Sequence, residues 1–231
     1  MINTFIFFLI FLFGKSIFSQ DIDQRIRKYL LENPEVIIKS LENYERKRLE
    51  ESKRKSNEAI IENNTKLNDS SNGMFSGNAN GNEIIIEFFD YNCSYCKKAH
   101  QDLIRISKNF PQVKIIYKNL PILSDQSKKL AEISLIIAKK NNKNFVKFHN
   151  FLLGKQGRID DADVVNFLTK LGIDFKEIEQ EFGGDYVSSE INKDLKLAQQ
   201  LALQGTPAFI VKNKLIFGYV GYDELLDQLK N

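Results

Sequence analysis

Cysteine and histidine are scarce in this sequence, which has two of each among 231 residues. Two cysteines are too few for a disulfide-built scaffold, and a chain of this length can bury a core without disulfides or metals. A zinc finger would need both histidines as further ligands, but His100 and His149 lack its spacing. Covalent haem attachment would need a histidine where Lys97 stands. We therefore expect no metal and no cofactor.

An excess of charge of one sign is also absent, because 33 basic residues oppose 30 acidic ones and leave a net charge of +3. This small excess does not favour binding to nucleic acid, and no helix-turn-helix or RNA-binding signature accompanies it. The composition, 42% hydrophobic and 27% charged, is typical of a globular chain. The length allows one ordinary domain with an appendage.

The N-terminus carries an apolar run from Phe5 to Phe13, which is too short to span a bilayer. Because small Ser19 precedes a polar residue, the pattern predicts a signal peptide over residues 1–19. An uncleaved membrane anchor is the alternative if the apolar segment extends through Phe18. Export would place the chain in the periplasm, where disulfides persist.

Residues 20–68 are predicted to form an N-terminal helical segment. Asn33 and Pro34 are typical of a helix start, and the helix that follows is expected to reach about Ile61. A long helix that is mostly polar buries little by itself, so it either binds a partner chain or lies in solvent. The stretch 69–82 is rich in Asn, Gly and Ser and is predicted to be a linker.

A homo-oligomer formed through residues 20–68 is one interpretation of the helical segment. Ile37, Leu41 and Tyr44 fit a heptad seam, but they fall short of the three or four heptads typical of a coiled coil. A solvated, monomeric spacer is the alternative that the sequence leaves open.

The remaining chain, residues 83–231, predicts an α/β fold. Residues 83–90, EIIIEFFD, form an apolar run of strand length, and a helical pattern follows them. A second strand begins near Val113, and a period of 3.6 residues then holds over about 124–203. A strand hairpin returns at 208–221 before a short final helix. This order predicts one domain with an inserted helical subdomain.

Both cysteines lie in one motif, DYNCSYCKKAH, between the buried strand and the helix after it. A structural bridge from Cys93 to Cys96 would contribute only about 2 kcal/mol, because the loop that it closes is so small. A thiol at a helix N-terminus has a lowered pKa, so Cys93 is the expected thiolate. Cys96, at a Cα distance of about 5–5.5 Å, is the expected buried resolving thiol. The pair predicts disulfide exchange through a mixed disulfide.

The same part of the chain contains four longer blocks, which are EFFDYNCSYCKKAH, YKNLPILSDQSKKLA, NFVKFHNFLL and GTPAFIVKNKLIFGYVGYDEL. These blocks resemble the DsbA family of thioredoxin-fold oxidoreductases, in its ScsC-like and Com1-like bacterial branch. The N-terminal stretch YLLENPEVIIKSLENYERK resembles the helical segment of that branch. The resemblance implies a thioredoxin-like fold with an inserted helical subdomain, preceded by an N-terminal helical segment.

The resemblance also implies roles for individual residues. Cys93 is the nucleophile, Cys96 resolves the mixed disulfide, and Pro207 lies in a cis-proline loop that faces the pair. Thr206 would then offer backbone groups to an extended substrate segment. An ordinary helix-to-strand turn is the alternative for the Gly-Thr-Pro step. The implied substrates are exported proteins with cysteines, and a membrane redox partner would reset the pair.

Glu87 is an anomaly, because it places a carboxylate inside an apolar strand. Burial would raise its pKa unless it is paired, and it could then exchange protons with Cys96. The resemblance also places an acidic residue here. The alternative is a side chain that reaches solvent from the strand end. His100 and His149 are expected to be surface or packing residues rather than catalytic ones.

The dipeptide Ser94–Tyr95 bears on the direction of electron flow. It lacks the ring that can carry a positive charge in the Pro-His dipeptide of strongly oxidising family members, so we expect a less oxidising disulfide. Together with Thr206, this favours isomerase or mixed activity. The alternative from a different class is a nonenzymatic protein that holds copper(I) with the same thiols, since two soft ligands suffice.

Overall fold

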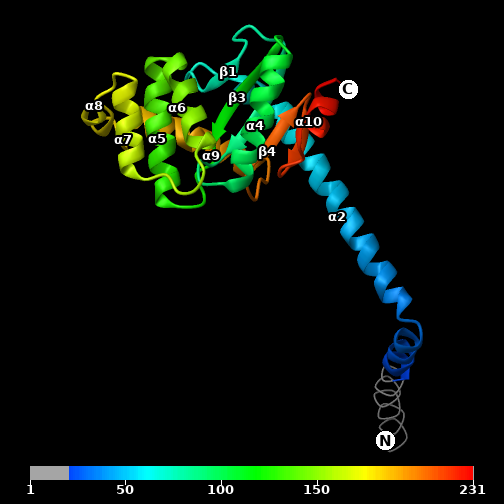
Figure 1. Cartoon of the computed structure of the whole chain (residues 1–231). Helices are drawn as coiled ribbons and strands as arrows, with labels where there is room; N and C mark the ends of the chain where they lie inside the picture. The colour runs from blue at the N-terminus through cyan, green and yellow to red at the C-terminus, as the bar shows by residue number, and fades with distance from the viewer. Residues whose placement is uncertain (1–20, 231) are drawn as a thin grey trace, which may run out of the picture. The chain divides into compact units, whose positions relative to one another are not determined.

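The computed structural model describes residues 21–230 (Figure 1). The chain divides into two compact units between Lys53 and Arg54. The first unit is helical from residue 21 and contains the first part of helix α2, Glu35–Glu62. α2 begins where the sequence predicted the second helix. No helix within residues 21–230 is both long enough and apolar enough to cross a bilayer. The predicted signal peptide, residues 1–19, lies outside the described part of the chain.

A five-stranded sheet forms the centre of the second unit, with the strand order β1-β3-β2-β4-β5. The strands are β1 Phe75–Gly77, β2 Glu83–Phe89, β3 Val113–Asn119, β4 Ala208–Val211 and β5 Lys214–Phe217. β2 and β3 are parallel, and the other neighbouring pairs are antiparallel. The predicted buried strand β2 is central, so its backbone groups pair along both edges.

Side chains of β2 alternate between two apolar clusters, one on each face of the sheet. Ile85 and Phe89 join the larger cluster, which also contains both cysteines. Ile86 and Phe88 join the smaller cluster on the opposite face. Because both faces are covered, the strand has a continuous apolar sequence rather than an alternating one.

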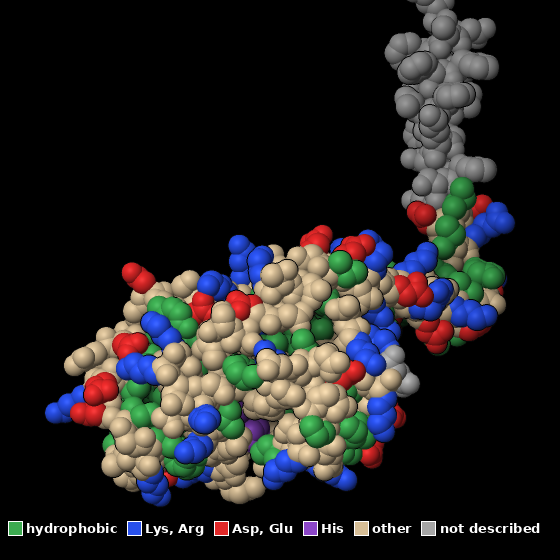
Figure 2. All heavy atoms as spheres, turned by 90° about the horizontal axis from the view of Figure 1, so that it is seen from above, with side chains coloured by type: hydrophobic (Ala, Val, Ile, Leu, Met, Phe, Trp, Pro, Cys, Tyr) green, Lys and Arg blue, Asp and Glu red, His purple; other side chains and the backbone are tan. Residues whose placement is uncertain are grey.

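Helices pack around this sheet and complete the predicted α/β fold. They are α3 Asn64–Asn68, α4 Ser94–Asn109, α5 Asp125–Lys140, α6 Asn142–Gly154, α7 Asp161–Lys170, α8 Phe175–Glu179, α9 Asp185–Gln200 and α10 Tyr222–Lys230. α5 contacts α6, α8 and α9, and Figure 1 shows α5 to α8 together at the end of the domain opposite α10. On the face shown in Figure 2, apolar side chains lie in patches between basic and acidic ones.

The stretch 69–82, predicted to be a linker, contains ordered structure that its composition does not reveal. β1 lies inside it and pairs with β3, and Met74 is fully buried. Gly77 has a φ of +76°, and a Cβ at this position would lie 2.5 Å from the carbonyl oxygen of Val113. Glycine is needed here because the backbone approaches β3 closely, so the linker prediction is wrong for this part.

Residues 54–68 belong to the second unit, although the sequence grouped them with the N-terminal helical segment. The last turns of α2 and the short helix α3 pack on the sheet, where Ile60 and Leu67 are buried in the smaller cluster. The predicted boundary after residue 68 therefore lies too far along the chain.

Lys118 fastens this segment to the end of β3. Its buried ammonium group donates to the carbonyl oxygens of Lys66, at 3.0 Å, and of Asp69, at 2.9 Å. It also lies 3.8 Å from a carboxylate oxygen of Asp194, which is buried on α9. The other oxygen of Asp194 accepts the backbone N–H of Asn119 at 2.8 Å. Burial raises the pKa of Asp194 to about 7, and the charge of Lys118 opposes that shift.

Replacing Lys118 with methionine should lower the free energy of unfolding by about 3–5 kcal/mol, because the buried carboxylate of Asp194 then has no cation. Urea unfolding above neutral pH, followed by circular dichroism, measures this loss. The double variant Lys118→Met with Asp194→Leu should recover most of it, since apolar side chains replace the ion pair. Lys143→Met, at an exposed position on α6, is the matched control. A loss below about 1 kcal/mol for Lys118→Met contradicts this role.

Candidate active site

Cys93 lies between the end of β2 and the start of α4 and caps the N-terminus of that helix. Its sulfur accepts the backbone N–H of Cys96 at 3.4 Å. Its own N–H donates to the carbonyl oxygen of Asp90 at 3.0 Å. The predicted position at a helix N-terminus is confirmed. The free N–H groups of the first helical turn therefore face the sulfur and favour a negative charge on it.

Cys93 is the acidic thiol of the pair. A hydrogen bond from the Cys96 side chain contributes most to lowering the pKa of Cys93 to about 6. The Thr206 side chain and the backbone N–H groups of Cys96 and Tyr95 act in the same direction, while burial opposes them. At neutral pH the sulfur is therefore mostly a thiolate, which is the form that attacks disulfides.

Cys96 has no exposed surface, whereas Cys93 is 7% exposed. Burial raises the pKa of Cys96 far above its usual value, and the hydrogen bond to Cys93 and the charge of Glu87 add to that shift. Both residues are free cysteines. One sulfur is thus ionised and partly accessible, while the other is protonated and buried.

The Thr206–Pro207 peptide bond is cis, as the resemblance implied. The carbonyl oxygen of Thr206 lies 3.2 Å from the Cys93 sulfur, within reach of a hydrogen bond donated by the thiol. The carbonyl oxygen of Pro207 accepts the N–H of Gly218 at 2.9 Å, and β4 begins at Ala208. The fold thus brings together two residues that are 113 positions apart in the sequence.

Glu87 lies in β2 and has no exposed surface. Neither of its carboxyl oxygens has a hydrogen-bond partner within residues 21–230. Burial raises the pKa of Glu87 well above its usual value, and the nearby charge of Cys93 raises it further. The alternative in which this side chain reaches solvent is wrong. A buried carboxyl group therefore lies close enough to both cysteines to change their electrostatic environment.

His100 and His149 are buried and pack against each other, with ring centroids 5.1 Å apart. His149 Nδ1 is 2.9 Å from the hydroxyl oxygen of Tyr91. Burial lowers the pKa of His100 to about 4 and that of His149 well below its usual value. Both rings are neutral packing groups of the core at neutral pH, and His100 does not lie at the surface.

Asp90 and Asn92, which precede Cys93, fix a neighbouring loop, and the sequence interpretation missed both. The carboxylate of buried Asp90 accepts the N–H of Asn92 at 2.8 Å and that of Leu123 at 3.0 Å. The Asn92 side chain donates to the hydroxyls of Ser124 and Ser127, at 3.0 Å each. The β3–α5 loop is therefore held beside the cysteine motif. An aspartate two residues before its own N–H partner is typical of an Asx turn, the one signal that the sequence offered.

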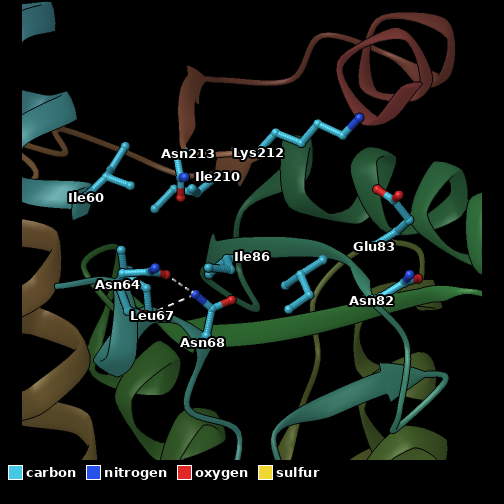
Figure 3. A pocket seen from close by; sticks show the side chains of 11 residues that line it. Ile60, Asn64, Leu67, Asn68, Asn82, Glu83, Ile86, Ile210, Lys212 and Asn213 are labelled. Carbon is cyan, nitrogen blue, oxygen red and sulfur yellow. Dashed lines mark hydrogen bonds between the residues drawn. The ribbon is translucent and has the colours of Figure 1, made fainter. Parts of the chain in front are cut away.

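A pocket of about 260 Å³ lies on the sheet face of the smaller cluster (Figure 3). Its lining residues are Ile60, Asn64, Leu67, Asn68, Asn82, Glu83, Ile84, Ile86, Ile210, Lys212 and Asn213. None of the predicted site residues lines this pocket, so it is separate from the cysteine site. Across the described residues, no group of three or more histidine, cysteine, aspartate or glutamate side chains is placed to hold a metal ion.

Comparison with known families gives a match for each of two parts of the chain. Residues 84–230, which include the cysteine motif, match the DSBA-like thioredoxin domain. Residues 20–51 match the N-terminal domain of the copper resistance protein ScsC. The first match alone covers more than half of the chain.

Individual relatives agree with this match. Disulfide bond formation protein D of Bacillus subtilis is 27% identical over 158 residues, which cover 63% of this chain and 70% of that protein. The catalytic domain of Proteus mirabilis ScsC is 26% identical, with a TM-score of 0.67 over 76% of this chain and 99% of that domain. A Proteus mirabilis ScsC structure in a transitional conformation, at 24% identity, shares the fold with a TM-score of 0.70 over 93% of this chain and 96% of that one. The chain belongs to the DsbA-like family of thioredoxin-fold proteins and is a thiol–disulfide oxidoreductase.

Proposed function

We propose that this oxidoreductase forms or rearranges disulfides in exported proteins of the periplasm, through Cys93 and Cys96. One observation carries the proposal, which is that the more accessible sulfur has a lowered pKa while its buried neighbour stays protonated. Disulfide exchange needs this asymmetry, because attack requires an accessible thiolate and release requires a second sulfur close behind it.

Exchange with a substrate disulfide begins at Cys93. Its thiolate forms a bond with one substrate sulfur, and the other substrate sulfur leaves as a thiolate that takes a proton from water. The backbone of Thr206, whose carbonyl oxygen is 3.2 Å from the attacking sulfur, would pair with an extended substrate segment next to cis-Pro207. The product of this step is a mixed disulfide.

Cys96 and Glu87 complete the exchange. To release a reduced substrate, the Cys96 thiol gives its proton to the fraction of Glu87 that ionises once Cys93 has lost its charge in the mixed disulfide, and the Cys96 sulfur displaces the substrate thiolate from Cys93. In the oxidising direction, a substrate thiolate attacks Cys93 of the enzyme disulfide. Cys96 then leaves as a thiolate and takes the proton of the Glu87 carboxyl group. The raised pKa of Glu87 suits it to both roles, because it brings the acidity of the carboxyl group closer to that of a thiol.

The residues between the cysteines favour isomerase or mixed activity over strong oxidation. Neither Ser94 nor Tyr95 offers a ring that can carry a positive charge beside the thiolate. The family in general acts on substrate proteins and is reset by a membrane redox partner. We infer that both kinds of partner apply here, with exported cysteine-containing proteins as substrates.

The N-terminal helices are a candidate homo-oligomerisation segment, which would present several active sites to one substrate. Their large apolar side chains are exposed, and these are Ile22, Ile26, Tyr29, Leu31, Val36, Ile37, Ile38, Leu41, Tyr44 and Leu49. An apolar surface of this extent is typical of an interface. The segment available for assembly is 20–53 rather than 20–68, because residues 54–68 pack on the sheet.

Copper(I) binding by the same thiols remains the alternative from a different class. The match to the ScsC N-terminal domain, residues 20–51, contains no cysteine or histidine and so offers no soft ligand. A redox titration separates the two functions. A reversible Cys93–Cys96 disulfide supports exchange, whereas stoichiometric copper uptake without such a disulfide supports the alternative.

Replacing Cys96 with alanine should raise the pKa of Cys93 above about 6, because the largest contribution to its low value is lost. The pH dependence of alkylation by iodoacetamide measures the change, since only the thiolate reacts. Cys96→Ser is the matched control, because its hydroxyl still donates a hydrogen bond and should preserve most of the lowering. An unchanged pKa in Cys96→Ala would show that the helix N-terminus alone stabilises the thiolate.

Replacing Glu87 with glutamine should raise stability at neutral pH. The folded carboxyl group stays protonated above its usual pKa of 4.5, whereas the unfolded one ionises, so the free energy of unfolding falls as pH rises through this window. The gain for Glu87→Gln should therefore grow by up to about 1.4 kcal/mol per pH unit above 4.5, measured by urea unfolding.

The same variant should slow release of the mixed disulfide by about a hundredfold, because the proton acceptor for Cys96 is missing. Stopped-flow mixing with a peptide disulfide measures this step, while alkylation of Cys93 should keep its rate. Glu83→Gln, at the start of the same strand, is the matched control. Equal release rates in the Glu87→Gln and Glu83→Gln variants rule out the proton-transfer role.

Replacing Ile37 and Leu41 together with aspartate should convert an oligomer into a monomer in sedimentation velocity, because charge enters the exposed apolar stripe. Leu49→Asp is the matched control, since Leu49 is equally exposed but lies off the Ile37–Leu41–Tyr44 stripe of α2. If the unmodified protein already sediments as a monomer, the helices are a spacer and the oligomer proposal fails.

A further inference from the structure

Exposed apolar side chains of the second unit gather around the nucleophile. Within residues 54–230, eight large apolar side chains are exposed, and six of them lie on the segments around Cys93. The six are Tyr95, Ile122, Leu123, Phe217, Tyr219 and Val220, and the other two are Ile61 and Val165. Exposed apolar side chains that gather on neighbouring segments of one domain are typical of a site that binds another molecule.

The six residues flank the thiol on two sides, because β3 and β4 lie on opposite sides of β2. Ile122 and Leu123 belong to the loop after β3, which the residues before the nucleophile hold in place. Phe217 ends β5 opposite Ala208, the residue after cis-Pro207. A polypeptide that crosses the sulfur would therefore contact apolar side chains before and after it.

Tyr95 and Tyr219 are held in position before any substrate arrives. Their rings stack with centroids 6.4 Å apart and an interplanar angle of 27°. The Tyr219 hydroxyl donates to a carboxylate oxygen of Asp102 at 2.8 Å, two turns along α4 from Tyr95. The ammonium group of Lys98 lies 5.2 Å from the centroid of the Tyr95 ring. These contacts fix both rings, yet 58% of Tyr95 and 37% of Tyr219 remain exposed.

We propose that Tyr95 and Tyr219 determine substrate specificity by binding an aromatic or large aliphatic side chain two residues away from the substrate cysteine. In an extended segment, side chains two residues apart point to the same face and lie about 6.5 Å apart. When the substrate cysteine points at Cys93, the side chains two residues before it and two residues after it therefore point at the exposed apolar side chains around Cys93. The directly adjacent side chains point away from it.

The occupant is an extended segment of an unfolded protein rather than a small thiol. The surface continues the substrate path proposed along Thr206 and Pro207, so the inference rests on the proposed function. A small disulfide can reach the Cys93 sulfur, but it is too short to contact the apolar side chains on either side of it. Folded proteins bury their large apolar side chains, so exposed ones next to a cysteine are typical of chains that have not finished folding.

Peptide disulfides with thionitrobenzoate test the inference, because attack by Cys93 on the peptide sulfur releases a coloured thiolate. The peptides contain one cysteine in a Gly-Ser background, with phenylalanine two residues before it, two residues after it, directly next to it, or absent. The measured quantity is the ratio of second-order rate constants with and without phenylalanine, so a change in thiol reactivity cancels. For the unmodified protein we expect a ratio of about ten in at least one of the two-residue positions and about one in the adjacent positions.

Variants assign this preference to the two rings. The ratio should fall to about two or less in Tyr95→Ser and Tyr219→Ala, while Tyr219→Phe and Asp102→Ala, which keep the aromatic ring at position 219 but remove its hydrogen bond to residue 102, should give intermediate ratios. Val165→Ser, at an exposed apolar position on α7, is the matched control and should keep the full ratio.

The outcomes separate this inference from the function on which it rests. A ratio near one at every position, in a protein that releases thionitrobenzoate normally, overturns the specificity and leaves disulfide exchange intact. A tyrosine variant that slows all peptides equally also overturns it, because the rings would then act on the thiol itself. Failure of the unmodified protein to react with any disulfide would instead overturn the proposed function.

Discussion

The hydrogen bonds that converge on the Cys93 sulfur are the interaction on which this site depends. The side chain and the backbone N–H of Cys96 both contribute, and the second sulfur is placed by the same helical turn. A single turn of α4 therefore lowers the pKa of one cysteine and buries the other, which has no exposed surface. Disulfide exchange depends on this difference, because the first sulfur must ionise in water while the second must wait in the core. The central strand β2 holds that turn rigidly, since its neighbours pair with it along both edges.

The core that buries Cys96 also buries ionisable groups, and these groups lower the stability of the fold. Glu87 is buried without a hydrogen-bond partner in the described part of the chain, and such a group lowers the stability of the fold when its pKa is raised. Buried His100 and His149 add to this, because both pKa values are lowered and protonation of the unfolded chain favours unfolding below about pH 6.5. The domain tolerates these groups because an extensive apolar cluster surrounds the cysteines. Only for Glu87 do we propose a chemical role that explains its retention.

Much of this site could be predicted from local sequence. The apolar run of β2 and the cysteine step after it indicated a thiol at a helix N-terminus, and the acid inside the run indicated a raised pKa. The errors have a common cause, which is that each depends on contacts between distant residues. The Asn-rich and Gly-rich stretch around Gly77 resembles a linker until β3 is placed beside it. Residues 54–68 resemble a free helix until buried Lys118 is seen to bind their carbonyl oxygens. The contact of Tyr219 with Asp102 spans 117 positions and leaves no local pattern.

The reduction potential of the Cys93–Cys96 pair tests the central claim most directly, because stabilising one thiolate stabilises the reduced form. A thiol pKa of about 6 lies between the values of about 7 for thioredoxin and about 3.5 for DsbA. Equilibration with glutathione buffers, read by alkylation and mass, should therefore give a potential between about −270 and −120 mV. A value at or below about −270 mV would contradict the account, because the Cys93 thiolate would then be no more stabilised than the active-site thiolate of thioredoxin.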